Sequence, residues 1–388
     1  MQPHRRITVA VGVSMFVDAS LYLAVLPLLP HYVDRFGLTT LQAGIVLAAY
    51  PVSVPFVSIA CIIWVPRIGA RRITVMSAML MTAATVVFAW APTATILTLA
   101  RFLQGAASGS IWTASMSWVT DNAPPGRRGR ESGIVMGMLS AGSVAGPGIG
   151  ALASVAGSGV AFGLVAAVSA AGIVLALLAP VGRTVVAEHD VRGAIARGAR
   201  QPATQAAIAL AAVDLIAFGA VDLLVPIHLG SHGESVVVIA SAIGVGALLG
   251  AAVGPFAGRL VDRIGPAPVG LAVACSVVAI PIVLALTPPN WVQLAVLIVG
   301  GPMFAIVGSA MFPLSTLGAD AAGVSHVTVT GLMGATWAAG FTIVPVALGV
   351  VADLTSPAVA YAVVVVAVAP VMLLLTRNVR RSALVSQA

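Results

Sequence analysis

Charged side chains are scarce in this sequence, which has 19 basic and 12 acidic residues among 388. A soluble globular domain carries about 25% charged residues, whereas this chain has 8%, so a surface solvated by water is excluded. Hydrophobic residues make up 60% of the chain. Because one membrane crossing takes about 20 apolar residues, the length predicts an all-α membrane protein with twelve transmembrane helices.

Lysine is absent altogether, and this absence excludes two kinds of chemistry. Neither a phosphate-binding Walker lysine nor a Schiff base can form without it. The sequence also has no Gly-x-Ser-x-Gly nucleophile motif and no paired catalytic carboxylates, and its six histidines lack metal-ligand spacing. We therefore predict a protein that is not an enzyme and that carries no cofactor and no metal.

Cysteine is nearly absent, since the sequence has only Cys61 and Cys275. Both residues lie inside apolar stretches, so neither a disulfide framework nor a thiolate cluster is indicated. They are interpreted as packing residues.

Apolar runs separated by turn and charge signals divide the chain into two sets of six predicted spans. The first set covers 7–33, 40–64, 73–91, 94–119, 132–155 and 160–181, and the second covers 203–229, 235–258, 267–287, 291–315, 327–352 and 357–376. The one long polar connector lies between the sets. We therefore predict an N-terminal six-helix bundle over 1–182, a cytoplasmic linker over 183–202 and a C-terminal six-helix bundle over 203–388.

All nineteen basic residues are arginines, and their distribution predicts the orientation. With a cytoplasmic N-terminus, 17 of the 19 arginines fall in cytoplasmic connectors or termini, and only Arg35 falls on the opposite side. Arginine-rich loops stay in the cytoplasm, so we expect both termini there and the protein in the inner (plasma) membrane. Because the net charge of +7 is spread over short loops, it favours anionic lipid over nucleic acid as a partner.

The two halves of the chain repeat short sequence patterns. Val65-Pro66-Arg67-Ile68-Gly69-Ala70 after the second span matches Val261-Asp262-Arg263-Ile264-Gly265-Pro266 after the eighth, at an offset of 196 residues (261 less 65). The spacing of Gly133, Gly142, Gly146 and Pro147 in the fifth span recurs as Gly331, Gly340, Val344 and Pro345, at an offset of 198 (331 less 133). Two matches at nearly one offset indicate an internal duplication, as in transporters whose repeats meet around a central site.

With these motifs the sequence resembles the major facilitator superfamily, in particular its twelve-span drug:proton antiporter branch. The loop signature Gly-x-x-x-Asp-Arg-x-Gly is intact as Gly258, Asp262, Arg263 and Gly265, and the first half keeps Arg67, Gly69, Arg71 and Arg72. Arg101, Gln104 and Gly105 are similar to the family's fourth-span motif. Gly133, Gly142, Gly146, Pro147 and Gly150 look like the motif of the antiporter branch, although Ala151 replaces its usual final glycine. The resemblance implies two pseudo-symmetric six-helix bundles that rock around a midplane cavity.

The fifth span carries a row of glycines on one helix face. Gly142, Gly146 and Gly150 recur every four residues, so a neighbouring backbone can approach closely. Pro147 lacks a backbone N–H and is expected to bend the helix beside that row. The resemblance favours a hinge or seal between the bundles, and ordinary small-residue packing is the alternative.

Four ionisable residues lie inside predicted spans, where such groups are costly and mark functional sites. They are Asp18, Arg101, Asp214 and Asp222. Asp18 lies about 16 Å down its helix, at 1.5 Å per residue, near the membrane midplane. Because desolvation disfavours a charged carboxylate, Asp18 is the first candidate for exchanging a proton against a cationic substrate. Tyr22 shares its helix face.

The other candidates surround this first one. Arg101, Gln104 and Trp112 fall on one face of span four, and we expect Arg101 to pair either with an aspartate or with backbone carbonyls. In the second half, Asp222 and Asp214 can contact substrate or protons, or can serve as hydrogen-bonding groups in helix packing. Trp112 and Trp337 can stack on a flat or cationic ligand, or can pack in the core.

The Asp262-Arg263 pair suggests a latch at the cytoplasmic side. An aspartate can dock on a helix N-terminus, where the dipole favours negative charge, and an arginine can hold a carboxylate. Pro66 replaces the aspartate in the first half, so a symmetric double latch is not expected. The same arginines, with Arg67 and Arg71, also enforce the topology.

The resemblance and the buried charges together predict a secondary active transporter that exchanges protons for small amphipathic or cationic compounds. A transporter of the same fold for a sugar, an amino acid or another metabolite is the alternative. Against it, asparagine occurs only near span ends, as Asn122, Asn290 and Asn378. A non-transporting membrane receptor or scaffold is a second alternative. We expect a monomer that contacts a small-molecule substrate, protons and the lipid bilayer, and no nucleic acid.

Overall fold

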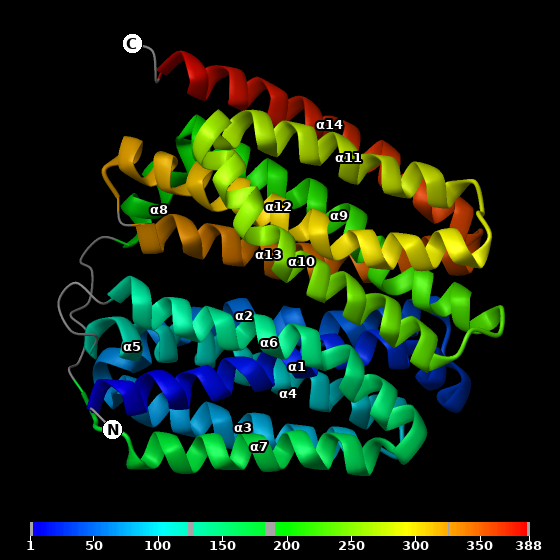
Figure 1. The fold of residues 1–388 in the computed structure, drawn as a ribbon, viewed down its shortest axis with the longest axis horizontal. Helices are drawn as coiled ribbons and strands as arrows, with labels where there is room; N and C mark the ends of the chain where they lie inside the picture. The colour runs from blue at the N-terminus through cyan, green and yellow to red at the C-terminus, as the bar shows by residue number, and fades with distance from the viewer. Residues whose placement is uncertain (1–2, 123–127, 183–190, 325, 386–388) are drawn as a thin grey trace. The chain divides into compact units, whose positions relative to one another are not determined.

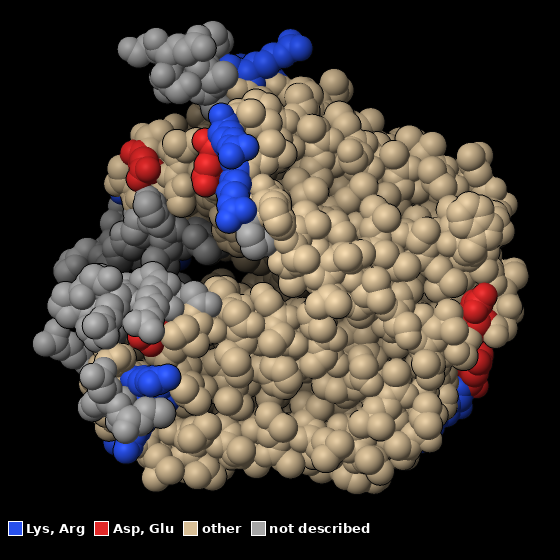
Figure 2. Space-filling view, viewed as in Figure 1, with Lys and Arg blue, Asp and Glu red and all other residues tan. Residues whose placement is uncertain are grey.

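The computed structural model of the chain describes residues 3–122, 128–182, 191–324 and 326–385. Within these ranges all regular secondary structure is helical, as predicted (Figure 1). Most of the face seen in Figure 2 is formed by uncharged residues, and charged side chains are few there. This surface agrees with the composition of a membrane protein.

The helices of the first half follow one another with short connections. They are α1 (Pro3–Phe36), α2 (Thr40–Ile68), α3 (Ala70–Ala89), α4 (Ala94–Ser110), the π-helical turn η1 (Ile111–Ser115), α5 (Met116–Asn122), α6 (Arg128–Ala156) and α7 (Ser158–Leu178). The second half comprises α8 (Val191–Arg200), α9 (Pro202–Ser231), α10 (Val236–Ile264), α11 (Pro266–Ala285), α12 (Asn290–Ala322), α13 (His326–Leu354) and α14 (Pro357–Val385).

Eleven of the described helices are long and apolar enough to cross a membrane. Each coincides with one predicted span. The remaining prediction, 94–119, falls on three consecutive pieces, α4, η1 and α5. The wider π turn interrupts what the sequence alone presents as one continuous helix, and such turns often mark functional sites.

The chain forms two compact units. Unit 1 comprises 1–38, 45–187 and 234–244, and unit 2 comprises 39–44, 188–233 and 245–388. The first turns of α2 thus group with unit 2, and those of α10 group with unit 1. The predicted linker at 183–202 places all of α2 in the first bundle and all of α10 in the second, so it did not predict that their first turns group with the other unit. Residues 183–190 of that linker lie outside the described ranges.

The basic segment between the halves forms a helix, α8, in unit 2. Ala194 is buried, and Gly198 lies against Val324, Val329 and Leu332 of the same unit. Arg192, Arg197 and Arg200 lie on this helix. Contact with anionic lipid stays a prediction.

The internal duplication is visible in matching turns. Gly69 between α2 and α3 has φ 96°, and Gly265 between α10 and α11 has φ 89°. Residues with a Cβ rarely adopt such angles, so glycine permits both abrupt turns. The joined helices also match in length, with 29 residues in α2 and α10 and 20 in α3 and α11. These equalities support the duplication that the sequence motifs indicated.

The glycine row of α6 faces α1 within unit 1. A Cβ at Gly146 would lie 2.8 Å from Leu23 Cβ, and one at Gly150 would lie 2.5 Å from the Ala24 carbonyl oxygen. A Cβ at Gly142 would overlap the Phe16 backbone. The predicted close helix approach is therefore confirmed. Its neighbour is α1 of the same unit.

Candidate functional site

Asp18 lies in the middle of α1 and is only 4% exposed. Its carboxylate accepts two hydrogen bonds from other helices of unit 1. The Tyr50 hydroxyl on α2 donates to Oδ1, and the Trp112 indole N–H of η1 donates to Oδ2 over 3.1 Å. The predicted burial of Asp18 is confirmed, and both of its oxygens have donors.

The π turn η1 carries Trp112. This side chain keeps its nitrogen on Asp18 while 39% of its surface stays exposed. The indole therefore joins a buried carboxylate to an accessible aromatic face. An aromatic face of this kind can stack on a flat or cationic molecule.

Arg101 of α4 is completely buried in the same unit. Its Nη1 donates to the Leu21 carbonyl over 3.2 Å and to Gln104 Oε1 over 3.1 Å. Of the two partners predicted for Arg101, the structure provides the backbone carbonyl. The described residues contain no ion pair between Arg101 and an acidic side chain, and Nε and Nη2 have no acceptor.

Tyr50 connects the two buried charges, and sequence reasoning missed it. Its hydroxyl bonds Asp18, and the Arg101 guanidinium lies 4.5 Å from its ring centroid. Tyr22 meets the Tyr50 ring edge to face at 5.4 Å. A tyrosine is an unusual residue in an apolar span, and this chain has four in all. That rarity was the available signal.

Close packing of α4 on α2 holds the Tyr50 backbone in place. A Cβ at Gly105 would overlap the Tyr50 carbonyl, so glycine permits this approach. The Ser53 hydroxyl lies 3.0 Å from the Tyr50 carbonyl oxygen and 2.9 Å from that of Phe102 on α4. Gln104 in turn donates from Nε2 to Thr85 Oγ1 over 3.3 Å. The fourth-span motif thus positions Tyr50 as well as Arg101.

The predicted site residues of the second half lie in unit 2. Asp214 of α9 is 4% exposed, and its Oδ1 has no hydrogen-bond partner among the residues that the structure describes. Asp222 is half-buried eight residues along the same helix, about 12 Å at 1.5 Å per residue. Trp337 of α13 packs on Phe341 with ring centroids 4.9 Å apart. The structure therefore brings Asp18, Tyr22, Arg101, Gln104 and Trp112 together in one unit, whereas Asp214, Asp222 and Trp337 belong to the other.

The predicted cytoplasmic latch residues are exposed in the last turn of α10. The side chains of Asp262 and Arg263 make no hydrogen bond or ion pair with the described part of the chain. Gly258 is partly exposed in the same helix. Arg67 is also exposed at the end of α2, and the surroundings of Gly133 lie outside the described residues.

Arg71 has a defined structural contact. Its Nε donates to the Ala176 carbonyl over 3.0 Å, and its Nη2 donates to the Leu177 carbonyl. The last carbonyls of a helix lack intrahelical donors, and a cation there also complements the dipole. Arg71 therefore caps the end of α7.

A carboxylate docks on a helix N-terminus elsewhere, within unit 2. Asp353 near the end of α13 accepts from the backbone N–H of Thr40 over 2.8 Å and of Leu41 over 2.9 Å. These N–H groups begin α2. The sequence predicted this interaction for Asp262, and the structure shows it for Asp353.

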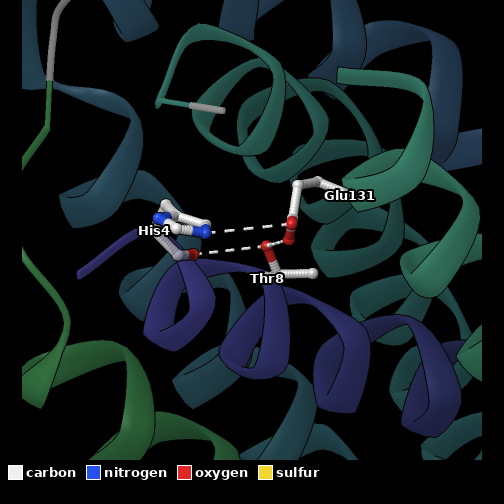
Figure 3. A network of polar contacts seen from close by, with 3 residues as sticks. All are labelled: His4, Thr8 and Glu131. Carbon is white, nitrogen blue, oxygen red and sulfur yellow. Dashed lines mark hydrogen bonds and ion pairs between the residues drawn. The ribbon is translucent and has the colours of Figure 1, made fainter. Parts of the chain in front are cut away.

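Glu131 forms a second buried polar contact between α1 and α6 (Figure 3). Its Oε2 accepts from the Thr8 hydroxyl over 2.6 Å, and its Oε1 lies 3.9 Å from His4 Nε2. The Thr8 hydroxyl also lies 3.2 Å from the His4 carbonyl oxygen. Glu131 lies just before the predicted span 132–155, so this contact was not predicted.

The sequence is similar to a family model and to known transport and resistance proteins. A family model described as Major Facilitator Superfamily matches residues 9–328. The MFS-type transporter ppzB of Metarhizium rileyi (strain RCEF 4871) is 30% identical over 148 residues, which cover 37% of this chain and 30% of that protein. The quinolone resistance protein NorA of Staphylococcus aureus is 25% identical over 126 residues, 32% of each protein. The matches thus span about a third of the length of these relatives.

A solved structure matches along the whole chain. It is a bacterial homolog of the human lysosomal transporter Spinster in an inward-facing, unoccupied conformation, with a TM-score of 0.70. The alignment covers 100% of this chain and 98% of that one at 16% identity. At this identity the likeness establishes the fold alone.

Proposed function

The chain belongs to the major facilitator superfamily of transporters, and we propose that it is a proton-coupled exporter of small amphipathic or cationic compounds. Transport proceeds by alternating access in two six-helix bundles. The drug resistance named for the Staphylococcus aureus relative supports export of this substrate class.

The observation that carries the proposal is the environment of Asp18. A carboxylate that is 4% exposed accepts from Tyr50 and from a half-exposed tryptophan. Ionised Asp18 attracts a cation whose flat part stacks on Trp112. A proton that binds Asp18 removes the negative charge, so the cation leaves. Proton and substrate therefore compete for one carboxylate, which is the minimum that exchange requires.

The second unit contributes further groups to the proposed exchange. Within unit 2, Asp222 is the first proposed contact for a substrate or a proton, and Asp214 on the same helix is the second. The membrane potential adds about 2.3 kcal/mol per net charge moved across 100 mV. The arginine distribution supports a plasma-membrane protein with both termini in the cytoplasm.

The test is pH-driven transport of a fluorescent lipophilic cation into everted vesicles, where the cytoplasmic face lies outside and accumulation in the lumen reports efflux. We expect Asp18→Asn to abolish pH-driven efflux while the purified protein remains monodisperse. Asp34→Asn is the matched control, because Asp34 is an exposed aspartate on the same helix. It should transport as the unmodified protein does. Unchanged efflux by Asp18→Asn would remove proton competition at this carboxylate from the mechanism.

A further inference from the structure

Tyr50 contacts two buried charged residues of unit 1, Asp18 and Arg101, and the described residues show no ion pair between these two. Its hydroxyl donates to Asp18 Oδ1, and its ring face receives the Arg101 guanidinium at 4.5 Å. The ring is thus held from two sides. A change in the charge of Asp18 acts directly on the Tyr50 hydroxyl and on the Trp112 indole N–H, which both donate to it.

The hydrogen bonding of Arg101 is incomplete in this arrangement. Nη1 has two acceptors, whereas Nε and Nη2 have none, although the side chain is fully buried. Buried donors without acceptors are costly, and a buried cation needs more than one aromatic face to offset its desolvation. The N–H groups on Nε and Nη2 of Arg101 can therefore donate to an acceptor that a side-chain movement brings within reach.

We propose that Tyr50 is the positioning residue that transmits the charge of Asp18 to Arg101. This inference rests on the proposed proton exchange at Asp18. With Asp18 ionised, the charge-assisted hydrogen bond fixes the ring over the guanidinium. A proton from the aqueous phase forms the new O–H bond on Asp18 and weakens the pull on the Tyr50 hydroxyl, because hydrogen bonds to neutral groups are about half as strong. Tyr50 keeps its own proton and turns its oxygen toward Nε and Nη2 of Arg101.

Among the groups around Asp18, only the Tyr50 side chain contacts both Asp18 and Arg101. The Tyr50 backbone is fixed by Gly105 and Ser53, so the phenol moves without its helix. Around Asp18, Tyr22 lies on α1, Trp112 lies on η1, and Ser108 and Arg101 lie on α4. On α6, which packs along α1, Glu131 is engaged by Thr8, ten residues from Asp18. None of these groups except Tyr50 contacts both charges by the contacts described above.

The experiment compares two tyrosine-to-phenylalanine variants in proteoliposomes. Tyr50→Phe keeps the ring over Arg101 and removes only the hydroxyl. Tyr32→Phe is the matched control, because Tyr32 is also buried in unit 1 and, among the described residues, its hydroxyl makes no hydrogen bond to Asp18 or Arg101. Efflux of a lipophilic cation is measured against pH, and binding of the same cation is measured separately.

The expected result is a change in coupling without loss of binding. Because the hydroxyl favours ionised Asp18, its removal moves the half-maximal pH of efflux upward by about one unit, as for loss of one charge-assisted hydrogen bond. The maximal pH-driven rate falls roughly tenfold, and cation affinity changes less than about threefold, because the proposed substrate contacts, Asp18 and Trp112, both remain. Tyr32→Phe leaves the pH profile in place.

Other outcomes overturn the inference. If Asp18→Asn abolishes coupling while Tyr50→Phe behaves as Tyr32→Phe, the Tyr50 role is wrong and the proposed function stands. If Asp18→Asn transports normally, the proposed function itself has failed. If Tyr50→Phe alone fails to fold, the hydroxyl serves the bundle and not the coupling, which also contradicts the inference.

Discussion

The contact of α1 with α6 in unit 1 corresponds to that of α9 with α13 in unit 2. In each contact a glycine faces a larger side chain, but the glycine lies on the opposite helix of the pair. In unit 1 the small residue is Gly146 on the fifth span, and Leu23 of α1 packs against it. In unit 2 the corresponding residue is Val344, and the small residue is Gly219 on α9, where a Cβ would lie 2.9 Å from Val344 Cγ1. The duplication has preserved the complementarity of the pair, and it has not preserved the residue at each position.

The polar interiors of the two units differ as well. Asp18 accepts from two donors in unit 1, whereas Asp214 Oδ1 in unit 2 has none. Arg101 is a buried cation near Asp18. The described arginines of unit 2 lie in α8 and in the last turns of α10 and α14. Buried donors therefore favour an ionised carboxylate at Asp18, whereas none of the described residues donates to Oδ1 of Asp214.

The sharpest test of this difference replaces each aspartate with leucine. Asp18→Leu leaves Tyr50 and Trp112 as buried or half-buried donors without acceptors, at roughly 1–3 kcal/mol for each donor. Asp214→Leu removes an oxygen that lacks a donor, so we expect no loss of stability or a gain. Thermal unfolding of the purified protein in detergent measures both. An equal fall in melting temperature for the two variants would contradict the contrast.

These tests depend on features that differ in how well the sequence predicts them. Spans, the glycine row and the burial of Asp18 and Arg101 follow from apolar runs and from residue spacing along one helix. Tyr50 and Asp353 act through contacts with helices far away in sequence, and no local pattern encodes such a partner. Asp353 looks like any solvated residue at a span end. The π turn after Ser110 likewise has no signal in an apolar run.

The aspartate latch shows the same limit in physical terms. A carboxylate near a helix end predicts the kind of interaction, because helix N-termini carry free N–H groups. It does not predict which N-terminus comes within about 3 Å, the length of such a hydrogen bond. The motif drew attention to Asp262, yet Asp353 makes the two hydrogen bonds.

A smaller difference in stability is expected between alanine variants of glycines that pack against backbone and those of glycines with no close neighbour. Gly142→Ala forces the Phe16 backbone to move, and overpacking of this kind costs about 1–3 kcal/mol. Gly340→Ala in unit 2 meets the Leu215 side chain, which can adjust in part, so its loss should be smaller. Gly148→Ala on α6 has no neighbouring atom within 4 Å and is the control. Melting temperatures should fall in the order Gly148→Ala, Gly340→Ala, Gly142→Ala, and equal values would remove the distinction.

The smallest expected effect concerns the polar contact at the start of α6. At the repeat offsets, Glu131 corresponds to the fully buried Val329, and Thr8 corresponds to Thr204, whose buried hydroxyl has no partner. Thr8→Val removes a 2.6 Å hydrogen bond to a carboxylate and should cost about 1 kcal/mol. Thr204→Val keeps the shape and removes an unpaired hydroxyl, so stability should stay equal or rise. The two valine variants have the same chemistry at equivalent positions, and the sign of their difference in melting temperature therefore reports whether Glu131 stabilises unit 1 in a way that unit 2 has lost.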